Sequence, residues 1–362
     1  MTRRHRHAFD AAVAAGDCEL VDPIADARWE DFLAQAPGAN VFHHPAWLEL
    51  LQRSYGYPMR ACCVTDEDGA VVAGLPLALV GGGLRSRRLA SLPFSDECPP
   101  LMAARAGGGV VSALAAGLDA LRRDLGLPLE VRGPLEVPGA SAQVTERYHQ
   151  HDIALESDFD AVVQRFRRRS QLLRGVRRAE KEGLTVERRT DAEALADFYR
   201  LHVATRRRQG VPTQPRSFIL RFADLFDRGL GFVLVVRDGD KPVAAAVFLH
   251  FNGVLTYKYG ASDPAALSKR PNNLLFLEAI RWGCEAGMRT LDMGRTDWDH
   301  ESLREFKLSW GAEERTLEYH ELTEAPRRTE GPGLARHAAP IIRRSPPLVS
   351  RLIGEALYRY AG

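Results

Sequence analysis

The segment from Leu291 to Gly311 reads LDMGRTDWDHESLREFKLSWG and decides the fold. It begins as a short apolar strand that runs into Gly294-Arg295 and continues as a polar turn with three acids and a histidine. It ends with Phe306-Lys307 followed by Trp310-Gly311. Charged groups gathered at the end of a buried strand, with one lysine among apolar residues, suit a ligand site better than a plain connection. We therefore expect the chemistry of this protein to lie in this segment.

The composition is that of an ordinary globular protein. A chain of 362 residues suits two domains, each large enough for its own core. The hydrophobic content is 45% and the mean hydropathy is −0.24. The formal net charge of +2 gives no general signal for nucleic-acid binding. Only five of the 49 basic residues are lysines. A GC-rich genome explains most of that bias, but it still makes Lys307 notable.

Cysteine usage and the N-terminus indicate where the protein works. The five cysteines are an odd number without the spacing of a metal site, and they lie at positions 18, 62, 63, 98 and 284. The N-terminus is basic without a continuous apolar stretch, and no window approaches the ~20 apolar residues of a membrane span. We expect a cytoplasmic protein without a bound metal, and a peripheral position at the inner face of the membrane stays open.

The order of predicted elements repeats along the chain. A first part reads helix, strand hairpin turning at Glu67-Asp68-Gly69, strand, helix, strand. A second part reads three strands, with turns at Asp238-Gly239 and Asn252-Gly253, then a helix capped by Asn272 or Asn273, then a strand. This repetition predicts an α/β (α+β) fold of two degenerate copies, each a mixed, mostly antiparallel sheet flanked by helices.

Four segments are expected from these patterns. Residues 1–16 form a flexible leader, 17–156 the N-terminal domain, 157–322 the C-terminal domain, and 323–362 a Pro/Arg-rich linker with a C-terminal amphipathic helix. In that helix Leu352, Ile353, Leu357 and Tyr358 would share one side. The helix either docks on the body of the protein or anchors it to a membrane or a partner.

The segment from Leu291 to Gly311 resembles the FDFGRS…FKxxWG signature of FemAB-like acyltransferases, tandem-domain members of the GNAT superfamily that include CelD-type acetyltransferase-like proteins. Three earlier stretches, NVFHHPAWLELL, GAVVAGLPLAL and LASLPFSDECPPL, resemble further family motifs in the same order. Glu97-Cys98-Pro99 departs from the family, where an aromatic residue and a glycine are common. The resemblance runs from about Val41 to Tyr319 and implies two GNAT-like domains that make amide (or ester) bonds, with catalysis in the C-terminal one.

The resemblance assigns roles within the signature. A Phe-Lys pair lies beside the acyl-transfer centre in aminoacyl-transferring members, and Phe306-Lys307 match it. The Lys307 ammonium would hold a phosphate or an oxyanion, unless it merely snorkels from its helix. Asp297 is the candidate general base, unless it simply pairs with Arg295, which would otherwise orient the acceptor. Phe306 and Trp310 are pocket wall or core.

An arginine-rich segment lies at the start of the second domain. RFRRRSQLLRGVRR, residues 165–178, holds seven arginines and no acid. Such a run is either a solvated helical face or a site for phosphate-rich ligands such as a nucleotide, a lipid-linked phosphate or a tRNA acceptor stem. The candidate phosphate-binding residues are Arg168, Arg169, Arg174 and Arg177.

Two further groups are candidate substrate contacts. Conventional GNAT enzymes place bare glycines at the helix start that holds the CoA pyrophosphate, whereas Asn273 and Leu275 stand there in this chain. Asn272 and Asn273 remain a candidate anion site, but we expect the side chains there to weaken binding of the CoA pyrophosphate. Tyr257 and Tyr259 alternate with Lys258, so we expect both tyrosines on one side of a strand, lining an acceptor pocket or the core.

The resemblance therefore implies an N-acyltransferase or aminoacyltransferase, with the donor as co-substrate and no tightly bound cofactor. The donor is aminoacyl-tRNA or acyl-CoA, and the acceptor is a phosphate-bearing amine on a cell-envelope, polysaccharide or specialised-metabolite precursor. Two alternatives stay open: an acyl-CoA-dependent N-acetyltransferase of exopolysaccharide biosynthesis, and a non-catalytic GNAT-fold binding module.

Overall fold

The computed structural model describes residues 18–82, 85–135 and 142–324, together with residues 9, 340, 342–343, 353–355 and 358. Among these residues the chain forms two compact units. The first takes in the described residues up to Arg147, those from Leu317 to 324, and 358; the second takes in Tyr148–Thr316 and 340–355. The expected leader lies outside the described residues except for residue 9, as does most of the tail, including Leu352 and Leu357.

The unit boundary differs from the expected limits of 17–156 and 157–322. It falls between Arg147 and Tyr148, inside strand β7 (Ala142–Ala154), and again inside strand β13 (Glu313–Leu322). Residues Tyr319–Leu322 of β13 pair antiparallel with β6 (Leu129–Arg132) of the first unit. Hydrogen bonding between strands far apart in sequence thus sets the boundary, and a linear pattern of elements does not reveal it.

The first unit is a sheet in the strand order β1-β2-β3-β4-β6-β13, with β5 paired to β3. Neighbouring strands are antiparallel except for β4 and β6, which are parallel. The remaining strands are β1 (Cys18–Val21), β2 (Met59–Thr65), β3 (Val71–Gly82), β4 (Arg85–Ala90) and β5 (Leu101–Met102). The helices are α2 (Ala27–Gln35), the 3-10 helix η1 (Val41–His43), α3 (Pro45–Tyr55) and α4 (Val110–Leu125).

Local sequence explains these elements. Gly69 adopts φ of 78° in the turn between β2 and β3, as the hairpin signal predicts. Helix α3 begins with Pro45, whose missing N–H costs nothing at a first helical position. Helix α4 repeats leucines at 114, 118, 121 and 125, and this face packs in the core of the first unit.

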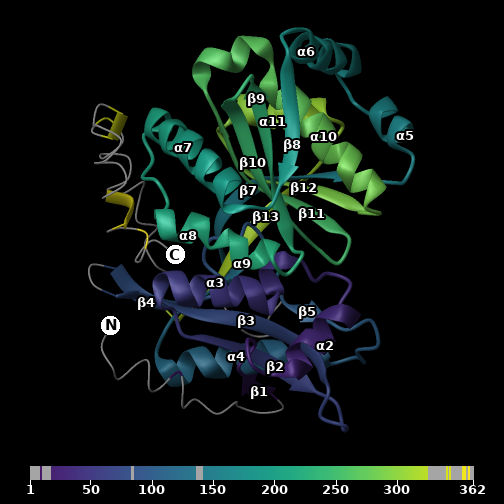
Figure 1. Ribbon diagram of the computed structural model, residues 1–362. Helices are drawn as coiled ribbons and strands as arrows, with labels where there is room; N and C mark the ends of the chain where they lie inside the picture. The colour runs from purple at the N-terminus through teal and green to yellow at the C-terminus, as the bar shows by residue number, and fades with distance from the viewer. Residues whose placement is uncertain are drawn as a thin grey trace. The chain divides into compact units, whose positions relative to one another are not determined.

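The second unit contains the strand order β7-β12-β11-β10-β9-β8 (Figure 1). Strands β11 and β12 are parallel, and the other neighbours are antiparallel. These strands are β8 (Leu184–Arg189), β9 (Gly231–Asp238), β10 (Lys241–Phe251), β11 (Val254–Ser262) and β12 (Thr290–Asp297). The helices are α5 (Phe159–Gln164), α6 (Arg169–Lys181), α7 (Ala192–Gln209), α8 (Arg216–Leu220), α9 (Phe222–Phe226), η2 (Pro264–Lys269), α10 (Pro271–Glu285) and α11 (Glu301–Ser309). The order β9-β10-β11-α10-β12 matches the predicted three strands, helix and strand.

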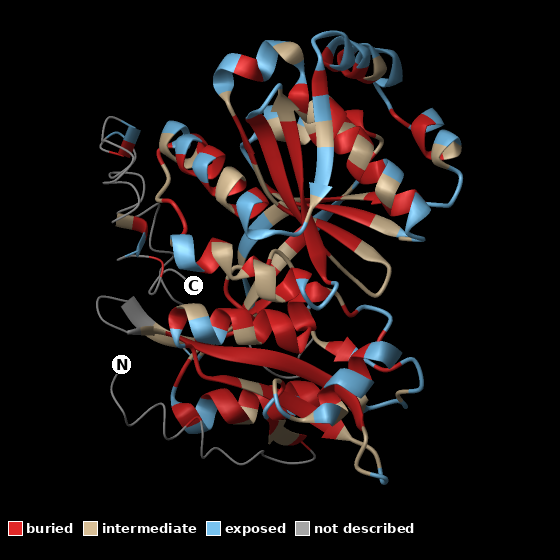
Figure 2. Ribbon diagram, in the orientation of Figure 1, coloured by how far each residue is buried: buried red, intermediate tan, exposed pale blue. Residues whose placement is uncertain are grey.

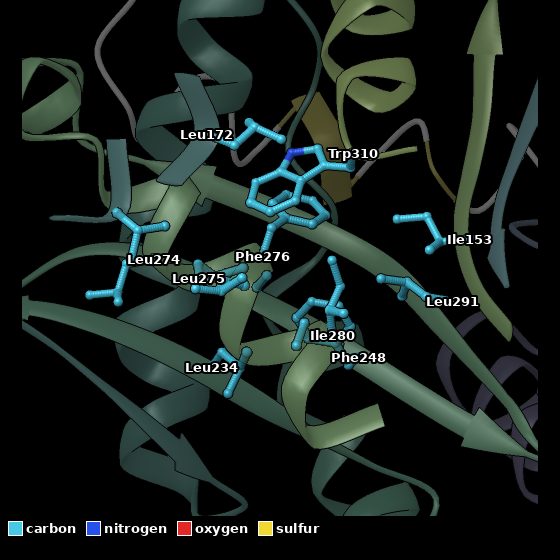
Figure 3. Close-up of a cluster of buried hydrophobic side chains, with 14 of the residues drawn as sticks. Ile153, Leu172, Leu234, Phe248, Leu274, Leu275, Phe276, Ile280, Leu291 and Trp310 are labelled. Atoms are coloured by element: carbon cyan, nitrogen blue, oxygen red, sulfur yellow. The ribbon is translucent and has the colours of Figure 1, made fainter. Parts of the chain in front are cut away.

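Both faces of this second sheet are covered along β9 and β10, which are mostly buried, whereas the edge strand β8 is more exposed (Figure 2). Phe232 and Leu234 of β9 belong to a buried cluster with Phe276 and Ile280 of α10 and with Trp310 (Figure 3). Val233, which lies between Phe232 and Leu234 in β9, is buried on the opposite face of the sheet, against which α7 packs. A strand buried on both faces reads as a continuous apolar run, which GFVLVV at the start of β9 does.

Two local details matter for the site. The turn between β10 and β11 has Asn252 and Gly253 at φ of 48° and 75°, the geometry that the Asn-Gly signal predicts. The prediction that Asn272 or Asn273 caps α10 is wrong. The residue before the helix is Arg270, in the left-handed region at φ of 64°, and Pro271 is the first helical residue. Proline favours that first position, so both asparagines fall inside the first turn.

No helix among the described residues combines the length and the apolar character needed to cross a membrane.

Candidate active site

Strands β11 and β12 pair over three residues and then separate. Val254–Thr256 lie beside Thr290–Asp292, and beyond that point β12 is shifted in register against β7, around Gly294. Gly294 adopts φ of 73°, and its N–H donates to Asp292 Oδ1 at 2.7 Å. The glycine of the signature therefore forms a bulge at which β12 leaves β11.

Lys307 lies buried against this bulge. Its side chain is 2% exposed, and Nζ donates to the carbonyl oxygens of Gly294 at 2.6 Å and Arg295 at 3.1 Å. A buried ammonium needs such partners, because desolvating it without hydrogen bonds is costly. Lys307 thus ties α11 to the bulge and places a positive charge there.

The structure does not bring Asp297 to Lys307. Arg295 and Asp297 pair with Gln150 and Tyr148 of β7, on one face of the strand, and the Arg295 guanidinium lies 4.1 Å from the centre of the Tyr148 ring. Asp297 is exposed on this face. Its neighbour Thr296 points to the other face, because side chains alternate along a strand.

A cavity of about 500 Å³ opens between α6, the start of α10 and one face of α11. Its lining carries four arginines, Arg168, Arg174, Arg178 and Arg270, and one acid, Glu305. Arg168 pairs with Glu305 across the cavity. The excess of positive charge favours an anionic ligand with several oxygens.

Only some of the predicted arginines and asparagines line this cavity. Arg168, Arg174 and Asn273 line it, whereas Arg169, Arg177 and Asn272 are not among its lining residues. Arg178 and Arg270 line it although neither was a predicted site residue. Their signal in the sequence was present: Arg178 follows Arg174 at i+4 on one helix face, and Arg270 directly precedes the proline of α10.

Asn273 joins the two helices that form this cavity. Its Nδ2 donates to the carbonyl oxygen of Leu172 at 3.4 Å. Gly175 faces it, and a β-carbon on Gly175 would lie 2.7 Å from Asn273 Nδ2. The side chain that replaces the first glycine of the conventional motif thus fills space at the start of α10.

Phe306 and Trp310 have different positions. Phe306 is half-buried, lines the cavity and packs edge-on against Phe276 with ring centres 5.2 Å apart. Trp310 is fully buried, packs against Phe166 and Phe276, and does not line the cavity (Figure 3). Its indole N–H has no hydrogen-bond partner among the described protein groups.

Tyr257 and Tyr259 lie on opposite faces of β11, contrary to the expectation of one shared side. Tyr257 packs against Phe276 of α10, whereas Tyr259 packs against His202 of α7. The cause is a bulge: Val247 pairs with Tyr259 and Phe248 with Tyr257, so Lys258 is an extra residue. Burial raises the pKa of Tyr257 to about 12.

A histidine cluster that the sequence interpretation missed lies on the Lys307 side of β12. The Glu314 carboxylate of β13 accepts two hydrogen bonds from Arg304, from Nε to Oε2 at 2.7 Å and from Nη2 to Oε1 at 3.0 Å. His151 Nε2 lies 3.0 Å from Glu314 Oε2, and His149 Nδ1 lies 3.4 Å from Oε1. The Trp298 indole stacks on the His149 ring at 4.1 Å and is 56% exposed.

The electrostatics of the cluster follow from these contacts. The hydrogen bond from Arg304 lowers the pKa of Glu314, which therefore stays ionised. Burial, together with the charge of Lys307, lowers the pKa of His151 to about 4, so this ring is neutral at pH 7. The sequence signal was the alternation in RYHQHDIAL, which puts His149 and His151 on one face of a strand. Among the described residues, no group of His, Cys, Asp and Glu side chains has the arrangement of a metal site.

Residues 166–307 match the family model described as the acetyltransferase (GNAT) domain. The structure is similar to that of FemX, with a TM-score of 0.63, 17% identity, and coverage of 84% of this chain and 96% of that one. It is also similar to L-PGS from Bacillus licheniformis, with a TM-score of 0.54, 16% identity, and coverage of 92% and 97%. A tandem GNAT protein from the clavulanic acid biosynthesis pathway is similar with a TM-score of 0.51 and 14% identity. The match covers 86% of this chain and 100% of that one. No curated protein matches the chain by sequence.

The second unit thus contains an acyltransferase domain of the GNAT class, and the chain has the tandem GNAT fold. The match of residues 166–307 to a GNAT model and the shared fold with FemX and L-PGS agree with the resemblance carried by the sequence motifs.

Proposed function

We propose that this acyltransferase moves an activated acyl or aminoacyl group from a phosphate-bearing donor to an amine. The donor is aminoacyl-tRNA or acyl-CoA, used as co-substrate, and the acceptor is a cell-envelope, polysaccharide or specialised-metabolite precursor. The observation that carries the proposal is the arginine-lined cavity between α6, α10 and α11, beside the GNAT signature.

The cavity suits the phosphates of either donor. Arg174 of α6 and Arg270, directly before α10, approach it from two sides, and their guanidinium groups present fixed donors that match phosphate oxygens. The start of α10 adds the positive end of a helix dipole. Phe306 supplies an apolar wall, as an acyl chain would require.

The start of α10 favours the aminoacyl donor. CoA-binding GNAT domains leave this helix start bare so that a pyrophosphate can reach the backbone N–H groups, whereas Asn273 occupies it in this chain. Pro271 also lacks the N–H that the first helical residue would offer. A donor held by arginine side chains rather than by the helix backbone fits both facts.

The acyl-CoA-dependent N-acetyltransferase is the second candidate. The description of the matching family as an acetyltransferase domain favours it. In both reactions the amine attacks the acyl carbonyl directly, without a covalent enzyme intermediate. Lys307 keeps the β12 bulge in place and supplies positive charge beside it.

Anchoring to a membrane through the C-terminal helix stays a prediction.

Donor binding tests the proposal. The melting temperature of the purified chain is measured with acetyl-CoA, a longer acyl-CoA and a stable aminoacyl-tRNA mimic, each at two salt concentrations. A ligand of the native state at 100 times its Kd adds about 2.7 kcal/mol to stability. We expect the tRNA mimic to raise the midpoint, and added salt to weaken the effect. A response to CoA species alone supports the second candidate.

Variants locate the binding site. Arg174→Gln and Arg270→Gln should each reduce the donor-induced shift, whereas Lys181→Gln, at the far end of the same helix α6 and outside the cavity lining, should not. No shift with any donor would overturn the proposal and favour a non-catalytic binding module.

A further inference from the structure

The acyl transfer proposed above requires a group that takes a proton from the amine. Once an amine nitrogen has attacked the acyl carbon, it carries an extra proton that must leave before the product is stable. Asp297, the candidate from the sequence, lies exposed on the face of β12 opposite Thr296. The histidine cluster lies on the face that holds Lys307.

We propose that His149 accepts this proton, and that Glu314 holds the His149 ring in the tautomer that can do so. The inference rests on the proposed acyl transfer and names the group that serves it. His149 Nδ1 lies 3.4 Å from Oε1 of the ionised Glu314, and the charge of this carboxylate favours the tautomer with the ring proton on Nδ1. The Nε2 atom is then the unprotonated end of the ring.

The surroundings of Glu314 fix its position. Each oxygen of the carboxylate receives one hydrogen bond from Arg304, and a histidine approaches each from β7. His151 cannot substitute for His149, because it is fully buried with Nδ1 3.5 Å from the Thr296 hydroxyl. His151 is a positioning residue: its neutral ring donates to Oε2 and leaves Oε1 for His149.

His149 itself is accessible from solvent. Its side chain is 12% exposed, and the ring packs flat against the half-exposed Trp298 indole. The charged and titratable groups that face it are Glu314 of β13 and His151 of β7, with Arg304 and Lys307 of α11 behind them. One carboxylate and two cations thus surround a ring that gains and loses charge during the reaction.

One proton is transferred twice during the acyl transfer. The acceptor nitrogen forms a C–N bond with the acyl carbon, and one proton on that nitrogen moves to His149 Nε2. The bond between the acyl carbon and the donor oxygen (or sulfur) breaks, and the leaving atom takes the proton back from the imidazolium. No proton is gained or lost overall, and Glu314 stabilises the imidazolium while it exists.

The test compares His149→Gln with His250→Gln, which alters a half-buried histidine of β10 that packs against Trp282. With the donor that binds, we expect His149→Gln to lower kcat about 10²- to 10⁴-fold. The donor-induced melting shift should persist. We expect the rate of the native chain to fall toward acid pH, as in a reaction with a general base, and this fall to vanish in His149→Gln. Glu314→Gln should lower kcat in the same direction, and imidazole should partly restore His149→Ala. A pH profile unchanged in His149→Gln, or a loss confined to Asp297→Asn, overturns the proposal.

A second measurement does not depend on turnover. Diethyl pyrocarbonate modifies unprotonated imidazole nitrogens, and mass spectrometry of the digested chain locates the modified residues. We expect His149 to react and His151 to stay protected. If no donor binds, the proposed function fails, and this measurement still decides: a reactive His149 keeps the assignment of an accessible, unprotonated ring nitrogen, and a protected His149 overturns it.

Discussion

Gly175 of α6 and Asn273 of α10 lie in direct contact, and a β-carbon on residue 175 would be 2.7 Å from Asn273 Nδ2. The same Nδ2 reaches the carbonyl oxygen of Leu172. This close approach of two helices brings Arg174 and Arg178 to the same cavity as Arg270. The arrangement of the arginines in the cavity therefore depends on the absence of a side chain at Gly175 and on the amide of Asn273.

Gly175→Ala should destabilise the chain. Alanine favours a helix by about 1 kcal/mol over glycine, but overpacking at a helix contact costs about 1–3 kcal/mol. We expect the free energy of unfolding, measured by urea titration, to fall and donor binding to weaken. The same change made in an Asn273→Ala background should cost less, because the Nδ2 and Cγ atoms that meet the new β-carbon are gone. A stabilising Gly175→Ala would contradict this contact.

Lys307→Met should lower the stability of the chain and change the titration of His151. The methionine fills similar space, but the carbonyl groups of Gly294 and Arg295 lose their donor, and each buried unpaired group costs about 1–3 kcal/mol. Removing the ammonium should also raise the pKa of His151, because the Lys307 charge helps to lower it. Urea titration and the pH titration of the His151 signal by NMR measure the two effects. An unchanged His151 titration would show that Lys307 does not act on the cluster.

Acid should destabilise the chain through its buried histidines. Burial lowers the pKa of His43 to about 4, that of His151 to about 4 and that of His202 to about 3. The unfolded chain binds these protons near pH 6.5, whereas the folded chain does not, so stability is present above pH 6.5 and falls toward pH 4. Each histidine should cost ~2 kcal/mol between pH 7 and pH 5. Urea midpoints at the two pH values measure the loss, and His202→Gln should reduce it. A midpoint independent of pH in this window would contradict the burial of these rings.

Trp310 should prove a core residue rather than a substrate contact. Trp310→Ala should lower the free energy of unfolding by about 3–5 kcal/mol, as for other large buried aromatic residues. Trp310→Phe should cost less, because phenylalanine keeps most of the packing and removes an indole N–H that has no partner among the described groups. Donor affinity in Trp310→Phe should equal that of the native chain. A selective loss of donor affinity would return Trp310 to the ligand site.

Much of the fold was predictable because its signals are local. The Asn252-Gly253 turn requires positive φ at two successive residues, which few sequences other than Asn-Gly favour, and the structure has that geometry. The apolar alternation and runs that mark β9, β10 and β11 likewise depend on neighbours a few residues away. The cap of α10 was predicted wrongly because proline at the first helical position competes with asparagine as the start signal.

The site was less predictable, because its members come from distant parts of the chain. Tyr257 and Tyr259 separate through a bulge whose extra residue, Lys258, is visible only in the pairing with β10. His149 and Glu314 are 165 positions apart in the chain, and they meet because β7 and β13 both reach the Lys307 side of α11.

The sequence alone determined the class of fold, the position of the signature at the end of β12, and the arginine-rich helix, because each depends on spacing within a single segment. The tertiary structure decided which arginines share a cavity, which face of β12 Asp297 occupies, and that two histidines meet a carboxylate beside Lys307. Contacts between residues far apart in the chain arise only when strands pair and helices pack, so no single stretch of sequence specifies them.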